Sequence, residues 1–150
     1  MSFTMSDYLV DTNILVYAYD RSEMAKKAAA ERVLVWLELK GSGVLSTQVM
    51  GEFFNSTTRK LVYKLTEAEA YRSLQRYLSV WRVLPVTGAI VLEAARASAR
   101  HQLAFWDAQI WATAKLNQIP IVLSEDLQHG QRIEGVQFLN PLKGDFPGKG

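Results

Sequence analysis

Short, continuously apolar runs alternate along this chain with longer segments of helical periodicity. Runs such as Tyr8–Val10 and Ile121–Leu123 lack a polar alternation, which predicts strands covered on both faces of a sheet. The predicted strands are residues 8–10, 44–46, 83–86, 121–123 and 136–139. Pro85 favours an edge position or a strand end for the third of them.

Helical patterns fill the intervals between these strands. The predicted helices are residues 20–40, 47 to about 62, 66–80, 89–101 and 106–117. Asp20 or Ser22 is the expected N-cap of the first, Gly41 its stop, and Thr66 with Glu69 forms a capping box. Because parallel neighbours need long crossovers, this alternation predicts an α/β fold, a three-layer α/β/α sandwich with a central, mostly parallel sheet.

Composition narrows the possible domain organisation, chemistry and location of the protein. The 150 residues, 49% of them hydrophobic, suit a single domain over residues 1–142, followed by a Gly/Pro-rich tail, 143–150, that we expect to be flexible. The absence of cysteine excludes thiolate chemistry and fits a reducing compartment, so we expect a cytoplasmic protein. We expect no secretory signal, and the apolar run Ile14–Tyr19 is too short to span a membrane.

Several acidic residues occupy positions where parallel sheets form binding sites. Asp11 directly follows the first predicted strand, and Asp126 lies three residues beyond the strand 121–123. The carboxyl ends of parallel strands meet at one rim, so both acids should lie there. Asp107 shares a helix face with Ile110, which directs its carboxylate toward the core.

Each acid also fits a purely structural role. Asp11 suits a turn or cap after a strand, and Asp107 suits a helix start, where free N–H groups favour an acid. Glu52 borders the apolar stripe of its helix, which is typical of a solvated surface residue. The chemistry alone leaves open whether Asp126 or its neighbour Glu125 belongs to a site.

A site shared by these acids favours the binding of a cation. Two carboxylates about 4 Å apart repel each other by roughly 4 kcal/mol at an effective dielectric near 20, so without a cation one of them should take up a proton and its pKa should rise. With two histidines and no cysteine, the ligands must be oxygens, which suit magnesium, manganese or calcium. A metal-bound water can attack a phosphate diester.

Four short motifs carry these acids, and together they resemble a known family. They are Val10–Ala18 (VDTNILVYA), Ser46–Phe53 (STQVMGEF), Phe105–Ile110 (FWDAQI) and Leu123–Gly130 (LSEDLQHG). In order and approximate spacing they resemble the PIN-domain ribonucleases, above all the VapC-type toxins of bacterial toxin–antitoxin pairs. The resemblance spans nearly the whole chain.

The resemblance implies roles for the four acids. Asp11 and Asp107 would be the main ligands of Mg²⁺ or Mn²⁺, and Glu52 and Asp126 would complete the catalytic pocket through waters or a second ion. The family pattern therefore selects Asp126 over Glu125. The implied reaction is hydrolysis of an RNA phosphodiester that leaves a 5′-phosphate.

It also implies supporting residues and partners. Thr12, Asn13 and Ser124 match polar positions that support the pocket through hydrogen bonds. The implied partners are an RNA substrate, a cognate antitoxin that covers the site and a second copy in a homodimer, with no membrane. We interpret Trp106 and Trp111 as core residues. Basic residues that could contact RNA phosphates are Arg21, Lys26, Lys27, Arg59, Lys60 and Lys64.

Other functions fit the sequence less well. A Rossmann domain lacks its glycine fingerprint here, and no G-x-S-x-G motif supports a serine hydrolase. A magnesium-dependent phosphatase or phospho-acceptor domain would also place an Asp after the first strand, but Asn13 stands where the haloacid-dehalogenase-like pattern has a second Asp. A non-catalytic RNA-binding adaptor is the non-enzyme alternative, and the full set of acids argues against it.

Overall fold

A six-stranded sheet lies at the centre of the computed structural model, which describes residues 6–143 and 146. The strands are β1 (Tyr8–Val10), β2 (Gly43–Ser46), β3 (Arg82–Leu84), β4 (Ile121–Leu123), β5 (Arg132–Ile133) and β6 (Val136–Leu139). Their order is β3-β2-β1-β4-β6-β5, and all neighbours are parallel except the β5–β6 hairpin. The mostly parallel sheet is confirmed, and β3 lies at its edge, as Pro85 predicts.

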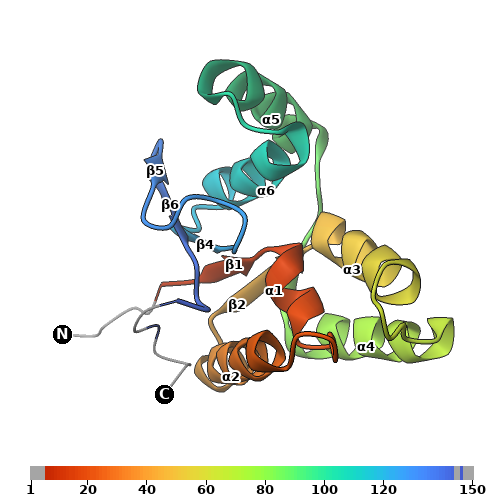
Figure 1. The fold of residues 1–150 in the computed structure, drawn as a ribbon. Helices are drawn as coiled ribbons and strands as arrows, with labels where there is room; N and C mark the ends of the chain where they lie inside the picture. Colours follow the sequence, from red (N-terminus) through yellow and green to blue (C-terminus); the bar gives the residue numbers. More distant parts are fainter. Residues whose placement is uncertain (1–5, 144–145, 147–150) are drawn as a thin grey trace.

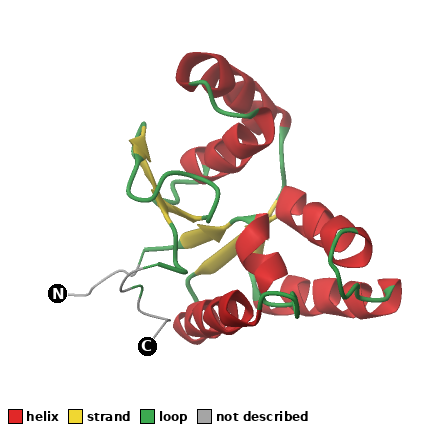
Figure 2. Cartoon of the chain, in the orientation of Figure 1, coloured by secondary structure: helices red, strands yellow, loops and turns green. Residues whose placement is uncertain are grey.

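Helices cover both faces of this sheet. Within the described residues they are α1 (Thr12–Tyr17), α2 (Met24–Lys40), α3 (Thr47–Arg59), α4 (Glu67–Val80), α5 (Gly88–His101) and α6 (Phe105–Leu116). Helices α5 and α6 lie on one side of the sheet and α1 to α4 on the other (Figure 1). Figure 2 shows the strands as the layer between them, which confirms the α/β/α sandwich. None of these helices is both long and apolar enough to cross a membrane.

Local capping explains where the helices begin and end. Helix α4 opens with the predicted capping box, and Gly41 ends α2 at a φ of 65°. The expected N-cap at Asp20 or Ser22 is wrong, because the Asp20 carboxylate accepts hydrogen bonds from Ser22 and closes a turn before the helix starts. Helix α3 ends at Arg59, short of the expected residue 62.

A two-residue turn closes the β5–β6 hairpin. Ile133 pairs with Val136, which leaves Glu134 and Gly135 as the turn. Both have positive φ angles, 46° and 88°, as in the type I′ turns that match the twist of antiparallel strands. The indole N–H of Trp111 on α6 donates to the carbonyl of Ile133 at 3.0 Å and holds the hairpin against the helix.

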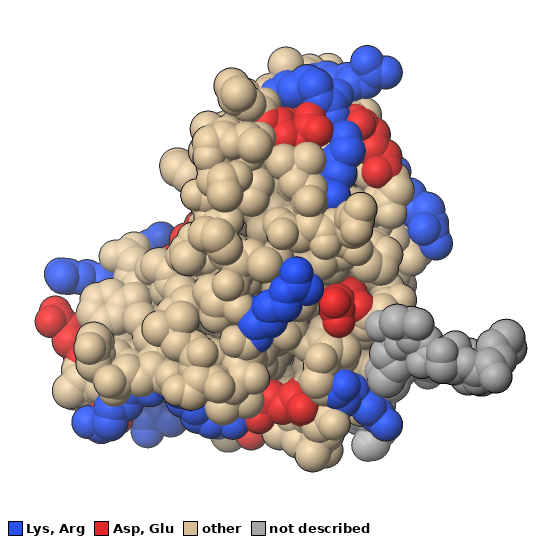
Figure 3. All heavy atoms as spheres, turned by 180° about the vertical axis from the view of Figure 1, so that it is seen from behind, with Lys and Arg blue, Asp and Glu red and all other residues tan. Residues whose placement is uncertain are grey.

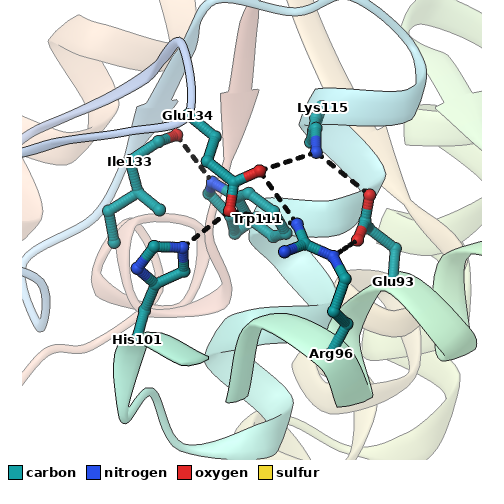
Figure 4. Close-up of polar contacts among 7 residues, drawn as sticks. All are labelled: Glu93, Arg96, His101, Trp111, Lys115, Ile133 and Glu134. Atoms are coloured by element: carbon teal, nitrogen blue, oxygen red, sulfur yellow. Dashed lines mark hydrogen bonds and ion pairs between the residues drawn. The ribbon is translucent and has the colours of Figure 1, made fainter. Parts of the chain in front are cut away.

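Charged side chains tie the same hairpin to α5 and α6 (Figure 4). The Glu134 carboxylate accepts hydrogen bonds from Arg96 and Lys115, each at 2.9 Å, and contacts His101 Nε2 at 2.6 Å. Glu93, which lies on α5, forms ion pairs with the same two side chains, Arg96 and Lys115. The two consecutive helices and the hairpin that follows β4 therefore meet around one carboxylate.

Phe146, close to the C-terminus, contacts residues of β1 and α2. Phe146 packs edge-to-face on Tyr8 and Trp36, with ring centroids 5.9 and 5.5 Å apart. The tail expected to be flexible is residues 143–150, and of these 144, 145 and 147–150 lie outside the described residues.

Candidate active site

The centre of the sheet places two site residues side by side. β1 pairs with β2 on one side and with β4 on the other, so crossovers leave in opposite directions at this point and open a crevice at the carboxyl ends. Asp11 follows β1 directly, and Ser124 follows β4 directly. The Ser124 hydroxyl donates to Asp11 Oδ2 at 2.7 Å and joins the two strand ends.

Asp11 is both a helix cap and the most buried acid of the site. It is the N-cap of α1, and its Oδ1 accepts the backbone N–H of Thr12 at 2.7 Å. Only 5% of its surface is exposed. The structural and functional interpretations of Asp11 are therefore compatible, because the cap uses one carboxylate oxygen and leaves the other facing Ser124.

Glu52 faces Asp11 from α3. Its Oε1 accepts hydrogen bonds from the hydroxyl of Thr12 at 2.8 Å and from Gln48 Nε2 at 3.3 Å. Gln48 also donates to the backbone carbonyl of Trp106 at 3.1 Å and accepts from Gln109 Nε2 at 2.8 Å. Gln48 thus connects α3 with α6, a role that nothing in the local sequence around it indicates.

Asp126 and Glu125 point to different places. Asn13 donates to Asp126 Oδ2 at 2.9 Å and accepts the backbone N–H of Glu125 at 3.1 Å, so it fixes the loop after β4. The side chain of Glu125 instead accepts the Tyr17 hydroxyl at 2.6 Å and pairs with Lys26 at 3.1 Å. Asp126 lies at the acidic pocket, and Glu125 does not.

All four predicted acids line one pocket. Its volume is about 100 Å³, and its walls are Asp11, Thr12, Asn13, Gln48, Glu52, Trp106, Asp107, Ile110 and Asp126. No lysine or arginine stands among these residues. The sequence-predicted carboxylates therefore come together at the carboxyl edge of the sheet, with Thr12 and Asn13 in the same wall and Ser124 behind Asp11.

Burial and mutual repulsion change the acidity of two of these groups. Burial raises the pKa of Asp11 to about 7, hydrogen bonds from Ser124 and Thr12 oppose the rise, and the charges of Asp107 and Glu52 add to it. Burial also raises the pKa of Asp107, and the nearby Asp126 and Glu52 contribute. The expected rise occurs, but burial is a larger cause than repulsion.

The oxygen atoms of the pocket fit a hard divalent cation, which only a few of them would contact directly. The pocket offers carboxylate, hydroxyl and amide oxygens, the donors that Mg²⁺ and Mn²⁺ prefer. Among the described residues, no three acidic or histidine side chains lie close enough together to ligate one ion. Magnesium usually takes one or two carboxylates and keeps several waters, so two direct ligands are sufficient.

The exposure of Trp106 corrects its interpretation as a core residue. Trp111 is fully buried, as expected, but Trp106 is 61% exposed and lies at the rim of the acidic pocket. It stands in the first turn of α6. His129, in contrast, lies outside this pocket, where its Nδ1 accepts the backbone N–H of Asn140 at 2.9 Å.

A second, basic hollow lies at the other end of α1. Its volume is about 480 Å³, and it is lined by Ala18, Tyr19, Arg21, Lys27, Tyr63, Lys64, Leu65 and Glu69. The Arg21 guanidinium lies 4.8 Å from the centroid of the Tyr63 ring. Three of the six basic residues singled out from the sequence therefore gather here. Of these, Lys27 also pairs with Glu31 on α2, and Lys26, outside the hollow, pairs with Glu125.

Fold and site together define the class of protein. The chain forms an α/β sandwich in which four carboxylates lie where the strand order switches direction. The PIN domain family model matches residues 8–132, and the chain therefore belongs to the PIN domain family. A search of curated protein sequences found no match.

Solved structures with the same fold include bacterial toxins. VapC20 of Mycobacterium tuberculosis, described as a toxin that cleaves the sarcin–ricin loop, is 22% identical, with a TM-score of 0.65 over 80% of this chain and 90% of its own. A toxin–antitoxin complex from Klebsiella pneumoniae is 20% identical, with a TM-score of 0.62 over 90% and 98%. DNA-bound VapBC from Salmonella typhimurium is 16% identical, with a TM-score of 0.63 over 89% and 97%.

Proposed function

We propose that this protein is a metal-dependent endoribonuclease that hydrolyses RNA phosphodiester bonds and acts as the toxin of a toxin–antitoxin pair. The observation that carries the proposal is the convergence of Asp11, Glu52, Asp107 and Asp126 on one small pocket. Carboxylates confined in this way are costly without a cation. Membership of the PIN domain family and the shared fold of the VapC toxins support the same activity.

The acids of the pocket and the residues that hold them have different proposed roles. Asp11 and Asp107 are the proposed metal ligands, and Glu52 and Asp126 act through waters or a second ion. A bound divalent ion supplies an activated water and neutralises charge on the phosphate. The Thr12 hydroxyl holds Glu52, and the Thr12 backbone N–H and the Ser124 hydroxyl together orient Asp11. With these carboxylates fixed before substrate arrives, little reorganisation is needed during the reaction.

Binding of RNA requires positively charged side chains outside the acidic pocket. We assign phosphate contacts to Arg21, Lys27 and Lys64 in the basic hollow, because a polyanion is repelled by the carboxylates themselves. Helix α1 connects the two places, since Asp11 is its N-cap and Ala18 its C-cap. Seven residues of helical rise separate them by about 10 Å, within the length of a short oligonucleotide.

Two protein partners and a location complete the proposal. The structural neighbours include toxin–antitoxin complexes, which supports a cognate antitoxin that covers the acidic pocket. We also propose a homodimer and a cytoplasmic site of action, in line with a chain that contains no cysteine. Size measurement of the purified protein, alone and with the product of a neighbouring gene, tests both associations.

Cleavage of total RNA tests the enzymatic proposal. The wild-type protein should cut in Mg²⁺ or Mn²⁺, stop when a chelator is added and resume when the metal is restored. Asp107→Asn should lower the cleavage rate by at least about 100-fold, because it removes a direct metal ligand while keeping the side-chain shape. Near-wild-type cleavage by Asp107→Asn would contradict the assignment.

The adjacent pair Asp126 and Glu125 provides a matched control. Asp126→Asn should lower cleavage strongly, whereas Glu125→Gln should leave the rate unchanged, because Glu125 bonds to Tyr17 and Lys26 outside the pocket. Hydrolysis of a small phosphate monoester without RNA cleavage would favour the phosphatase alternative. RNA binding without any cleavage would favour the adaptor alternative.

A further inference from the structure

Trp106 stands apart from the other three tryptophans of the chain. It is 61% exposed, whereas Trp81 is 6% exposed and Trp111 is fully buried. Trp36 is half-buried and packs against Tyr8 and the core. An indole ring left in water beside a polar pocket forgoes the burial that usually stabilises such a side chain.

The backbone of Trp106 is held in place while its ring remains accessible. Gln48 donates to the Trp106 carbonyl at 3.1 Å from the facing helix α3. Phe105 supports the ring from one side, edge-to-face at a centroid distance of 5.1 Å. The next residue is Asp107, so the position of the ring is fixed relative to a proposed metal ligand.

The acidic pocket itself is too small to enclose a nucleotide and offers no positive charge to hold one. Its volume of about 100 Å³ is well below the roughly 300–1,000 Å³ of pockets that enclose a whole small-molecule ligand. That space suits an ion with its waters and phosphate oxygens, so a nucleobase must lie outside the pocket. The lining contains no Lys or Arg, and Trp106 is the large, exposed apolar side chain at its rim.

We propose that Trp106 is a stacking platform for an unpaired RNA base next to the phosphate at the acidic pocket. The inference rests on the proposed ribonuclease function and adds a substrate class to it. Aromatic rings bind bases by stacking only when the base face is free, so the RNA is single-stranded or looped at this position. Stacking accepts every base, which makes Trp106 a source of affinity and placement and not of sequence choice.

Binding measured in chelator, where cleavage is blocked, tests this proposal directly. The probes are a short single-stranded oligoadenylate and an abasic oligonucleotide of the same length. Oligoadenylate should quench the tryptophan fluorescence of the wild type. Trp106→Ala should raise the Kd for oligoadenylate roughly 5- to 150-fold, and Trp106→Tyr should retain most of the affinity. The Kd for the abasic probe should remain the same in all variants.

Leu116→Ala is the control for loss of an exposed apolar side chain, because Leu116 lies on the same helix and is 44% exposed. It should bind both probes like the wild type. Equal affinities of Trp106→Ala and the wild type for oligoadenylate would overturn the platform, as would a change in self-association without a change in RNA binding. Quenching without cleavage in Mg²⁺ would support the platform and refute the nuclease, whereas cleavage without any effect of Trp106→Ala would do the reverse.

Discussion

Asp11 combines three demands on one side chain. It caps α1, it accepts the hydroxyl of Ser124 and it is buried next to other acids. Burial alone makes the charged form unfavourable, and the hydrogen bonds offset only part of this cost. The residue is therefore expected to reduce the stability of the metal-free protein whenever it is ionised, which is typical of a group retained for its chemistry.

Stability measured against pH should reveal this cost. Burial raises the pKa of Asp11 from 3.8 to about 7, so the folded protein binds a proton that the unfolded chain releases within this window. Stability from this group is therefore present at low pH and lost as pH rises through the folded pKa. In chelator, Asp11→Asn should match the wild type near about pH 3, gain on it as the pH rises above the ordinary Asp pKa, and exceed it near about pH 8 by at most about 4 kcal/mol.

Urea unfolding at both pH values provides the measurement. Magnesium should stabilise the wild type at the higher pH, because it binds the ionised carboxylates of the folded state. It should have little effect on Asp11→Asn. A gain in stability that is equal at both pH values would argue against titration of Asp11 as its source.

At the scale of elements, much of the structure follows from local sequence. The strands Tyr8–Val10 and Ile121–Leu123 were predicted with the observed bounds, because short apolar runs between helices leave few alternatives. The capping box at Thr66 fixed the start of α4 for a similarly local reason. Helix α1 and strand β5 were not predicted, because six and two residues are too few to show a periodicity.

The site was less predictable than the strands. Asp11 and Asp126 could be placed at one rim by the strand-end rule, but Glu52 could not be told from a surface residue without the resemblance. The roles of Gln48 and Trp106 depend on the distance between α3 and α6, which no local pattern contains. Trp106 has helical spacing typical of a core residue, yet it precedes the part of α6 that packs on the sheet.

The charged cluster at the β5–β6 turn gives an element-level prediction. His101, Lys115 and Arg96 lower the pKa of Glu134 to about 2. Stability from the cluster is therefore complete above the ordinary Glu pKa and lost as pH falls toward 2. Glu134→Gln should lower the melting temperature by a few degrees at neutral pH, and the difference should shrink in acid and in high salt.

Thermal unfolding followed by circular dichroism checks this prediction. The control is Glu31→Gln, which removes the partner of Lys27 in a single pair along one exposed helix. Such pairs contribute little, so its melting temperature should stay near that of the wild type. Equal losses in both variants would show that the cluster does not fasten the hairpin.

At the scale of the whole molecule, charge is distributed unevenly although the net charge is only +2. On the face opposite the view of Figure 1, broad areas carry no charged side chain, and basic and acidic side chains gather in groups at the edges and near the middle (Figure 3). The acidic pocket and the basic hollow lie at the two ends of α1. A polyanion can therefore be attracted at one place and reach the carboxylates at the other.

Salt dependence of RNA binding measures this attraction. Arg21→Ala and Lys64→Ala should each weaken binding and reduce the slope of log affinity against log salt by about 0.7 per lost contact to a single strand. Arg100→Ala is the matched control, because Arg100 is an exposed cation on α5, on the other side of the sheet. An unchanged slope in the first two variants would remove the basic hollow from the RNA path.

The bridge made by Gln48 has a consequence for how the two helical layers meet. Glu52 belongs to one layer and Asp107 to the other, and beyond the sheet edge two uncharged amide side chains join them. Hydrogen bonds of this kind contribute about 1 kcal/mol each and carry no net charge. The two layers are therefore joined beside the pocket without neutralising its acids, which leaves their negative charge to be balanced by a proton or by a cation from solvent.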